Sequence, residues 1–394
     1  MEFRPYYLAR EWVRAGHRVQ IVAASQSHVR AVQPSPGDEV IDGIAYRWLP
    51  TPGYSGNGLG RVKNIWAFCR QLWADASCVA ADFNPDVVIA SSTYPMDIWV
   101  ARRIARLANA KLVYEVHDLW PLSPIELSGM SPRHPFALLC QKAENDAYRD
   151  ADVVISMLPK VHEHMAAHGL DLRRLTVVPN GITLDEWDGK GETLNAELTA
   201  FLDAQHAAGK IVLGYAGSHG LPNALDVLLD AAKLLLGHGS AHIAVVMVGG
   251  GHEKARLAQR VVDEGLLNVT LFPPIPKPQI PGLLARFDIA YIGWQRTPIY
   301  RFGIAPNKLM DYMMARRPVL HSVEAGNDPV AEAQAGLTVP PEDAAAVAAG
   351  VLQLAALSAD ECAAMGERGR AFVLANHTYP VLAARFVEAV GRIS

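Results

Sequence analysis

Short apolar runs alternate with amphipathic segments along almost the whole chain, and this alternation limits the folds that it can adopt. The runs are rich in Val, Ile and Leu, as strands buried on both faces of a sheet should be. Such strands, joined by crossover helices, build parallel sheets. Strands are predicted at residues 18–24, 86–90, 111–116, 152–157, 175–179, 210–216, 242–248, 268–272, 288–293 and 318–322. The predicted fold class is α/β, with two doubly wound sheets.

The seam between the two halves is expected at Pro179-Asn180-Gly181, where a strand ends in a turn dipeptide before a polar stretch. The first domain is predicted to cover residues 1–182 and the second residues 183–376. Only helical patterns remain from Glu342 onward, and the last of them, at about residues 377–394, is expected to complete the first domain. Two α/β halves would place ligands at the carboxyl ends of both sheets.

The start of the chain departs from the usual pattern of such a domain. An amphipathic helix is predicted over residues 6–15, with Gly16 as its C-cap, and a strand follows. In a doubly wound domain the first strand and its glycine-rich turn are normally central. That strand is missing from the given chain. Either the start is truncated, or the first sheet has a gap or a substitute strand between the strands at Arg18 and Asp86.

Composition excludes several classes of protein. With 394 residues, two or three domains are expected, and a net charge of -4 argues against a protein that coats nucleic acid. The four cysteines show no CxxC spacing, so neither a zinc ribbon nor a disulfide scaffold is indicated. No apolar run reaches the roughly 18 residues that span a bilayer, and the start lacks a secretory signal. We therefore expect a cytoplasmic protein unless something docks it to a surface.

Polar residues follow the strand predicted at 111–116. His117 and Asp118 lie at its carboxyl end, the position from which α/β proteins project catalytic groups. The alternative is a loop histidine satisfied by a backbone carbonyl. The sequence alone leaves both open.

Two glycine-rich turns follow strands in the second half. Gly217, Ser218 and His219 come after one strand, and Gly249 opens a similar turn after the next. Glycines there let backbone N–H groups approach an anion at a helix N-terminus. The alternative is a tight connection between strand and helix.

A loop that begins at Arg301 is predicted to become a helix near Asn307. Lys308 and Asp311 are three residues apart on one face of that helix. The lysine could meet a phosphate while the carboxylate accepts from hydroxyls. An exposed ion pair between the two is the alternative.

Three other features carry weaker signals. His162, His164 and His168 include a pair at i,i+4, but the HExxH order is absent and no further ligand is evident, so a solvated helix face and no metal site are predicted. The glycine-rich segment at 56–60 is interpreted as a mobile loop. A basic amphipathic helix, Leu59–Trp73, could lie in a membrane interface or pack against the core, and the sequence does not separate these alternatives.

Taken together, these segments resemble the retaining glycosyltransferases of family 4, which have the GT-B fold of two facing Rossmann-like domains with a cleft between them. The resemblance covers nearly the whole chain. It rests on the strand ending at His117, on the Pro-Asn-Gly hinge, on the two glycine turns and on residues 302–319. Within the family, the chain most resembles the bacterial surface-polysaccharide subgroup, which includes transferases of N-acetyl-fucosamine type. The motifs that suggest this subgroup are Asp118-Leu119-Trp120-Pro121 and Pro306-Asn307-Lys308.

The resemblance implies a UDP-sugar donor, a polyprenyl-diphosphate-linked or glycan acceptor, and work at the inner face of the membrane. By position, His117 would touch the donor sugar near C6, and Asp311 would bind the ribose as the second carboxylate of a Glu-x7-Glu motif. The backbone from Gly303 through Ile304 to Asn307 would cradle the distal phosphate and sugar. Ile275 would lie near the base, and Asp118 and Trp120 would lie on the acceptor side.

The chain departs from the family pattern at three positions. Gly303 replaces the first carboxylate of the motif, and Ser218 and Asn223 stand where many relatives carry Arg and Lys. A leaving diphosphate still needs positive charge. The nearby candidates for that charge are Lys308, Arg301 and His219.

The function predicted from the sequence is therefore transfer of a sugar from a UDP-sugar to an acceptor hydroxyl, with retention of configuration. Lys308, helix N-termini and glycine-turn amides would stabilise the leaving diphosphate. No bound metal and no cofactor beyond the UDP-sugar substrate are expected. A nucleotide-sugar epimerase on the same fold and a non-catalytic GT-B scaffold subunit remain as alternatives.

Overall fold

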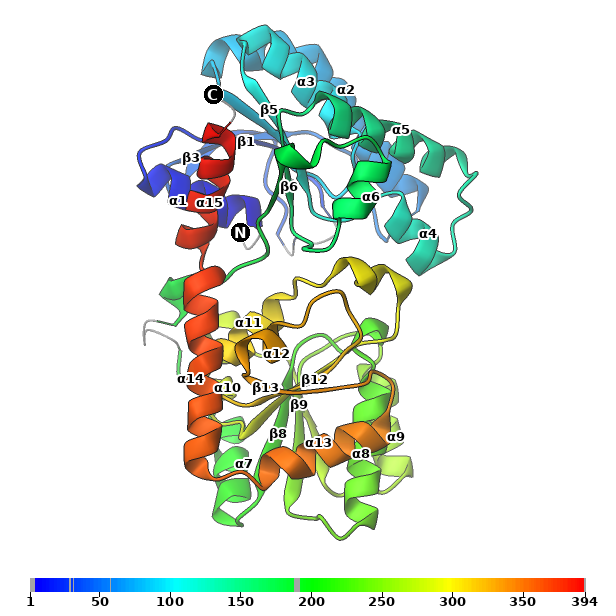
Figure 1. Ribbon diagram of the computed structural model, residues 1–394, viewed down its shortest axis with the longest axis vertical. Helices are drawn as coiled ribbons and strands as arrows, with labels where there is room; N and C mark the ends of the chain where they lie inside the picture. Colours follow the sequence, from blue (N-terminus) through cyan, green and yellow to red (C-terminus); the bar gives the residue numbers. More distant parts are fainter. Residues whose placement is uncertain (1–3, 28–29, 31, 57, 188–191, 393–394) are drawn as a thin grey trace. The chain divides into compact units, whose positions relative to one another are not determined.

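The computed structural model describes residues 4–392 except 28–29, 31, 57 and 188–191. Part of the predicted mobile loop, residue 57, lies outside the described residues. The chain divides into two compact units (Figure 1). The N-terminal unit comprises Met1–Pro179 and Tyr379–Ser394, and the C-terminal unit comprises Asn180–Thr378. The sequence placed these boundaries at residues 182 and 376.

The N-terminal unit holds two sheets. Four parallel strands lie in the order β4 (Val87–Ala90), β5 (Lys111–Val116), β6 (Val153–Ser156) and β7 (Leu175–Val177). The other three strands lie in the order β1 (Gln20–Ala24), β3 (Ile44–Leu49) and β2 (Gly37–Ile41), with β1 parallel and β2 antiparallel to β3. No ladder joins β1 to β4 among the described residues, so these strands belong to two sheets that are separate at the place where the sequence analysis allowed for a gap.

The hairpin of β2 and β3 was missed by the sequence analysis, which expected a single sheet in this half. Four of the five residues of β2 are exposed, so the strand has no apolar run. The signal that could have revealed it is the turn: Ile41 pairs with Ile44 across the two-residue loop Asp42-Gly43. Asp-Gly between alternating hydrophobic residues is a strong hairpin signal.

Helices cover both sheets of this unit. Helices α1 (Arg4–Arg14) and α15 (Tyr379–Gly391) lie side by side (Figure 1). Their apolar side chains pack against those of β5 and β6. Helices α2 (Leu59–Phe83) and α3 (Asp97–Ala108) form a second core with β3. The remaining helices of the unit are α4 (Leu122–Ser128), α5 (Pro135–Asp150) and α6 (His162–Ala167).

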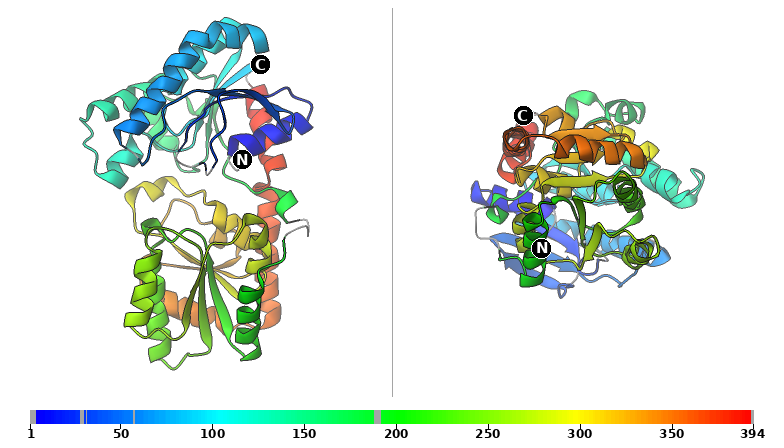
Figure 2. Two further views of the ribbon diagram at one scale, coloured as in Figure 1. Left: turned by 180° about the vertical axis from the view of Figure 1, so that it is seen from behind. Right: turned by 90° about the horizontal axis from the view of Figure 1, so that it is seen from below.

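The C-terminal unit is built on one six-stranded parallel sheet (Figure 2). Its order is β10 (Val269–Phe272), β9 (Ile243–Val248), β8 (Ile211–Ala216), β11 (Ile289–Gly293), β12 (Val319–Ser322) and β13 (Gly336–Val339). The chain builds outward from β8 in one direction and then from β11 in the other. Strand order therefore reverses between β8 and β11.

Alternate residues of these strands face two separate cores. One core lies under α7 (Ala196–Ala207), α10 (Ile280–Leu284), α11 (Asn307–Met314), α12 (Pro329–Ala333) and α14 (Ala359–Asn376). The other lies under α8 (Leu225–Gly237), α9 (Lys254–Asp263) and α13 (Ala344–Ala355). In β8, Val212 and Ala216 face the first core while Leu213 and Tyr215 face the second. This burial on both faces explains the uninterrupted apolar runs.

Every strand predicted from the sequence is present, with ends that agree to within about two residues, the usual uncertainty of such boundaries. The α/β class is confirmed. Besides the hairpin, the sequence analysis missed β13, which is short and only half-buried.

Among the described helices, none is by itself long and apolar enough to cross a membrane. Only α13 and α14 together meet the criterion, and they are bent by 112°.

Candidate active site

The candidate site of the C-terminal unit lies where the strand order reverses. The turn Gly217–Gly220 follows β8, and the loop after β11 meets it, because the Gln295 amide donates to the carbonyl of Pro222 at 3.1 Å. In doubly wound sheets, ligands bind at the carboxyl ends of the strands at this point.

The two glycine turns pack against each other too closely for side chains. A Cβ on Gly249 would lie 1.8 Å from the carbonyl oxygen of Gly217. The backbone amides of both glycines are in use: Gly217 N donates to Val248 O and Gly249 N to Phe272 O. The amide of His219 likewise donates to Gly250 O at 2.7 Å. These three amides therefore hold the turns together and do not point at a ligand in this structure.

Lys308 contacts residues of the turn after β8. Its Nζ donates to the Tyr215 hydroxyl at 3.1 Å and to Asn223 Oδ1, and its stem passes Gly217. Tyr215 and Asn223 in turn both donate to the carbonyl oxygen of Ser218. Burial lowers the pKa of Lys308 from 10.5 to about 8. The structure thus places Lys308 beside Ser218 and Asn223, the two positions where the family pattern has cations.

His219 does not supply positive charge. The residue is fully buried, and neither ring nitrogen has a hydrogen-bond partner among the described residues. Burial, together with the nearby charges of Lys254 and Lys308, lowers its pKa to about 4. The imidazole is therefore neutral at neutral pH when no ligand is bound, so it is a weaker candidate than Lys308 for the charge that faces a diphosphate.

Arg301 lies on the surface of the preceding loop. Its Nη1 donates to the carbonyl of Pro298 at 2.7 Å, and its guanidinium lies over the Phe302 ring at 4.3 Å. The side chain is exposed in this conformation. Lys308 is therefore the better-placed of the two remaining cation candidates.

Two asparagines fasten the loop that leads into α11. Asn327 Oδ1 accepts from the Ile304 amide at 2.7 Å, and Asn180 Nδ2 donates to the Ala305 carbonyl at 2.9 Å. The Gly303 amide donates to Tyr300 O. The sequence analysis expected this backbone to cradle a phosphate, but the amides of Gly303 and Ile304 already donate within the loop. Asn307 is the first residue of α11.

Gly303 itself has a backbone φ of +101°. Side chains other than glycine rarely adopt this conformation. This geometry explains why the first carboxylate of the family motif is missing at this position: the loop, as folded here, requires glycine.

Asp311 and Ile275 have surroundings that differ from those of Lys308. Burial, and the charge of Glu186 nearby, raise the pKa of Asp311 to about 7. Ile275 is half-buried against the core cluster that includes Leu309 of α11. Among the described residues, no ion pair joins Lys308 to Asp311, so the alternative of a surface pair between them is not what the structure contains.

In the N-terminal unit, His117 is held by side chains and not by a backbone carbonyl. Its Nε2 lies 2.9 Å from Ser91 Oγ and 3.1 Å from Glu115 Oε2. Glu115 is only 2% exposed, and its other oxygen accepts from Arg4 Nε at 2.8 Å. Arg4 also donates to the carbonyls of Val178 and Pro179. Arg4 and His117 hold the pKa of Glu115 well below its usual range despite burial.

Asp118 and Trp120 belong to the turn that follows. Asp118 accepts from the Leu119 amide, from the Ser123 hydroxyl and, at 3.2 Å, from Trp120 Nε1. Both carboxylate oxygens are thus used by the turn. The guanidinium of Arg61 lies over the Trp120 ring, 5.0 Å from the ring centroid.

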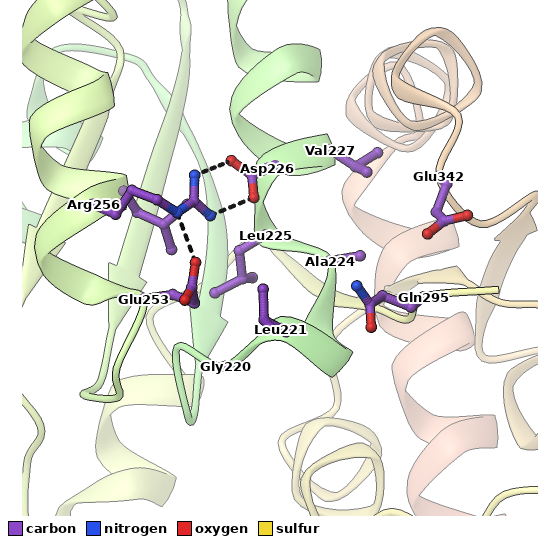
Figure 3. Close-up of a pocket in the computed structure, with 11 residues that line it drawn as sticks. Gly220, Leu221, Ala224, Leu225, Asp226, Val227, Glu253, Arg256, Gln295 and Glu342 are labelled. Carbon is purple, nitrogen blue, oxygen red and sulfur yellow. Dashed lines mark hydrogen bonds and ion pairs between the residues drawn. The ribbon is translucent and has the colours of Figure 1, made fainter. Parts of the chain in front are cut away.

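A small pocket lies beside the turn after β8 (Figure 3). It is lined by Gly220, Leu221, Ala224, Leu225, Asp226, Val227, Glu253, Arg256, Leu257, Gln295 and Glu342. Its volume is about 120 Å³, below the roughly 300 Å³ of typical ligand sites. Its one guanidinium, Arg256, is already paired with Asp226 and Glu253, as Figure 3 shows. Three carboxylates and a satisfied arginine do not make a diphosphate site.

The histidines of α6 are arranged differently from the prediction. His162 is exposed, as expected for a solvated face. His164 and His168 instead lie half-buried beside Glu144 of α5, and the ligand atoms of these three residues all lie within 4.8 Å of one another. A carboxylate therefore accompanies the histidine pair, and the spacing along α6 gave no sign of it.

Several residues that shape the site were not found from the sequence: Ser91, Glu115, Asn180, Tyr215 and Asn327. One of them carried a signal. Glu115 is a carboxylate inside a strand that is otherwise apolar, and a buried charge requires a partner. The others act through contacts between residues far apart in the chain, which no local pattern reports.

Comparison with known families identifies both halves of the chain. The description "Glycosyl transferase 4-like domain" matches residues 1–181, and "Glycosyl transferases group 1" matches residues 210–356. A comparison with curated proteins finds no match.

Solved structures share the fold at low sequence identity. Alr3699/HepE of Anabaena, crystallised with UDP and glucose, is 17% identical over 89% of this chain and 87% of that one, with a TM-score of 0.61. Sucrose-phosphate synthase of Thermosynechococcus elongatus is 17% identical over 98% and 91%, with a TM-score of 0.70. WaaG, a glycosyltransferase involved in lipopolysaccharide biosynthesis, is 14% identical over 98% and 93%, with a TM-score of 0.64.

The two family matches together cover most of the chain, and the strand orders and structural neighbours agree with them. The chain is a glycosyltransferase with the GT-B fold, in which a glycosyl transferase 4-like domain is followed by a glycosyl transferases group 1 domain.

Proposed function

We propose that this enzyme transfers a sugar from a UDP-sugar to an acceptor hydroxyl with retention of configuration. The observation that carries the proposal is the half-buried ammonium of Lys308 at the point where strand order reverses in the C-terminal unit. HepE, which shares the fold, binds UDP and glucose in its crystal structure. A nucleoside diphosphate is the anion that we assign to this point.

The charge balance around Lys308 supports an anionic ligand. Its hydrogen-bond acceptors, Tyr215 and Asn223, are neutral, and no carboxylate pairs with its Nζ among the described residues. A desolvated cation without a counter-charge costs free energy in the empty site. A diphosphate would supply that counter-charge, and the interaction strengthens as negative charge develops on the leaving group.

The remaining roles follow the resemblance to family 4. Asp311 would accept from the ribose hydroxyls and Ile275 would pack near the uracil, while His117 would contact the sugar. The leaving phosphate would take the proton of the acceptor hydroxyl as the new bond forms on the same face of the sugar. No metal is assigned to this step, because Lys308 supplies positive charge to the leaving group.

We further propose that the acceptor is lipid-linked and serves surface-polysaccharide synthesis, with an N-acetylated amino sugar as a candidate donor. One supporting observation is a stripe along α2, which we call the α2 stripe: Leu59, Val62, Lys63, Trp66, Arg70 and Trp73, all exposed. The opposite face of α2, with Ile65, Phe68 and Leu72, packs into the core. Exposed tryptophans beside basic side chains suit the interface of an anionic membrane. WaaG, a structural neighbour, acts in lipopolysaccharide biosynthesis.

The proposed function is tested in two steps. A thermal-shift panel of nucleotides and nucleotide sugars identifies the donor, since a ligand that binds the folded state raises its stability by mass action. UDP release is then measured with and without acceptor, and NMR of the product gives its anomeric configuration. Release that requires acceptor, with retention, supports the proposal. Interconversion of sugars without UDP release would favour an epimerase, and no nucleotide binding would favour a scaffold.

The lipid contact has its own test. Co-sedimentation with anionic vesicles is expected to fall in Trp66→Ser and to stay unchanged in Leu267→Ser, a matched control that is 91% exposed in the other unit. Equal sedimentation of both variants and the parent would exclude the α2 stripe as the contact.

A further inference from the structure

A cluster in the N-terminal unit, separate from the proposed donor residues, has the composition of a metal site. Glu144 comes from α5, His164 from α6 and His168 from the residue that ends α6. One ligand atom from each lies within 4.8 Å of the others, and the two imidazole centroids are 4.6 Å apart. Two imidazoles and a carboxylate are a set that Zn²⁺ and similar ions favour.

The spacing of two of these atoms fits a metal better than a hydrogen bond. His164 Nε2 lies 3.4 Å from Glu144 Oε1. An N–H···O bond is normally about 2.7–3.2 Å long. Two ligands of a tetrahedral ion with bonds of about 2.0–2.1 Å lie roughly 3.4 Å apart. The pair therefore already has the separation of two ligands of one ion.

Gln141 contacts two members of the cluster. Its Nε2 donates to Glu144 Oε2 at 2.7 Å and lies 3.0 Å from His168 Nδ1. It also donates to Asn145 Oδ1 at 2.9 Å, and His168 Nδ1 lies 3.2 Å from the same oxygen. These amide contacts help to position the Glu144 carboxylate and the His168 ring beside each other.

The carboxylate is fixed in place while the histidines remain accessible. Glu144 is 1% exposed, and the fully buried Tyr148 donates to its Oε1 at 2.9 Å. Outer hydrogen bonds of this kind orient the ligands of metal sites. His164 and His168 are only half-buried and Asn145 is exposed, so an ion can enter from solvent.

We propose that Glu144, His164 and His168 bind one Zn²⁺ or a related transition-metal ion, which ties α6 to α5. Three protein ligands leave a fourth position for water. This site is distinct from the donor site, and the proposal does not depend on the proposed function.

The test uses the full chain after treatment with a chelator that is then removed. Zn²⁺ is titrated by calorimetry, and Co²⁺ is added separately so that its visible absorption reports the coordination. We expect one Zn²⁺ per chain and a tetrahedral Co²⁺ spectrum. His164→Gln, His168→Gln and Glu144→Gln should each weaken Zn²⁺ binding at least about tenfold, since each removes one ligand.

The matched control is His162→Gln on the same helix, whose side chain is exposed and outside the cluster. It should bind Zn²⁺ like the parent. If Glu144→Gln does not fold, the two histidine variants decide the question. Failure of the parent to bind Zn²⁺, or equal affinity in His164→Gln, His168→Gln and His162→Gln, would overturn the proposal and leave the cluster as a hydrogen-bonded contact between helices.

Discussion

Replacing Lys308 by methionine tests two effects of the buried charge: it lowers the stability of the protein without ligand, and it raises the affinity for UDP. Methionine keeps an unbranched stem beside Gly217 and removes the charge. Burial lowers the pKa of Lys308 from 10.5 to about 8. A difference of this size disfavours the folded state by about 3 kcal/mol at neutral pH.

The sign of the pH dependence follows from proton binding. Between the folded and unfolded pKa values the unfolded state binds more protons, so stability rises with pH. Between pH 7 and pH 9 this lysine should add about 1 kcal/mol to the stability of the parent. Denaturant unfolding at both pH values should show that gain in the parent and not in Lys308→Met, while other titrating groups cancel in the comparison.

UDP binding should show the reverse trend. A diphosphate binds the charged lysine, so the affinity of the parent should fall about tenfold between pH 7 and pH 9. Lys308→Met should bind UDP about ten- to a hundredfold more weakly at pH 7, the loss of one charge-assisted contact, with little pH dependence. Lys233→Met, which removes an exposed lysine paired with Glu264, is the control. A Lys308→Met variant that keeps parental UDP affinity and pH dependence would refute this role.

Three further predictions concern other residues. His117→Ala should lower kcat far more than it weakens UDP binding, and Glu115→Gln, which changes the carboxylate that holds both His117 and Arg4, should lower kcat less. Loss of UDP affinity with unchanged kcat in His117→Ala would contradict the assignment. Asp311→Asn should weaken uridine and UDP alike in calorimetry, and a selective loss of UDP would place this residue at the phosphates instead. Gly249→Ala should destabilise the C-terminal unit by several kcal/mol, because the new Cβ would lie 1.8 Å from a carbonyl oxygen. The control, Gly237→Ala, has open space at a helix end and should be neutral or stabilising by up to about 1 kcal/mol. Equal unfolding midpoints for the two variants would contradict the packing argument.

Most of the fold was predictable because its buried strands appear in the sequence as short runs of apolar residues. Strands such as Ile243–Val248 are apolar throughout, since both faces are buried. The strand Gly37–Ile41 was missed because it is mostly exposed, although its Asp42-Gly43 turn carried a signal. Local patterns thus report strands that are buried on both faces and overlook those at an exposed edge.

The site was predictable only in part, because its chemistry depends on tertiary contacts. The helical period placed Lys308 and Asp311 on one helix, but the encounter of Lys308 with Tyr215 joins residues 93 positions apart. The neutrality of His219 follows from burial, which the glycine-rich motif does not encode. Periodicity also paired His164 with His168, yet the third group, Glu144, comes from a different helix.

A crystal structure of the full chain with bound UDP tests the central claim most directly. The account predicts the diphosphate within hydrogen-bonding distance of Lys308 Nζ, at the turn after β8, with the ribose at Asp311 and the uracil beside Ile275. UDP bound without contact to Lys308, for example in the acidic pocket around Asp226, Glu253 and Glu342, would contradict it.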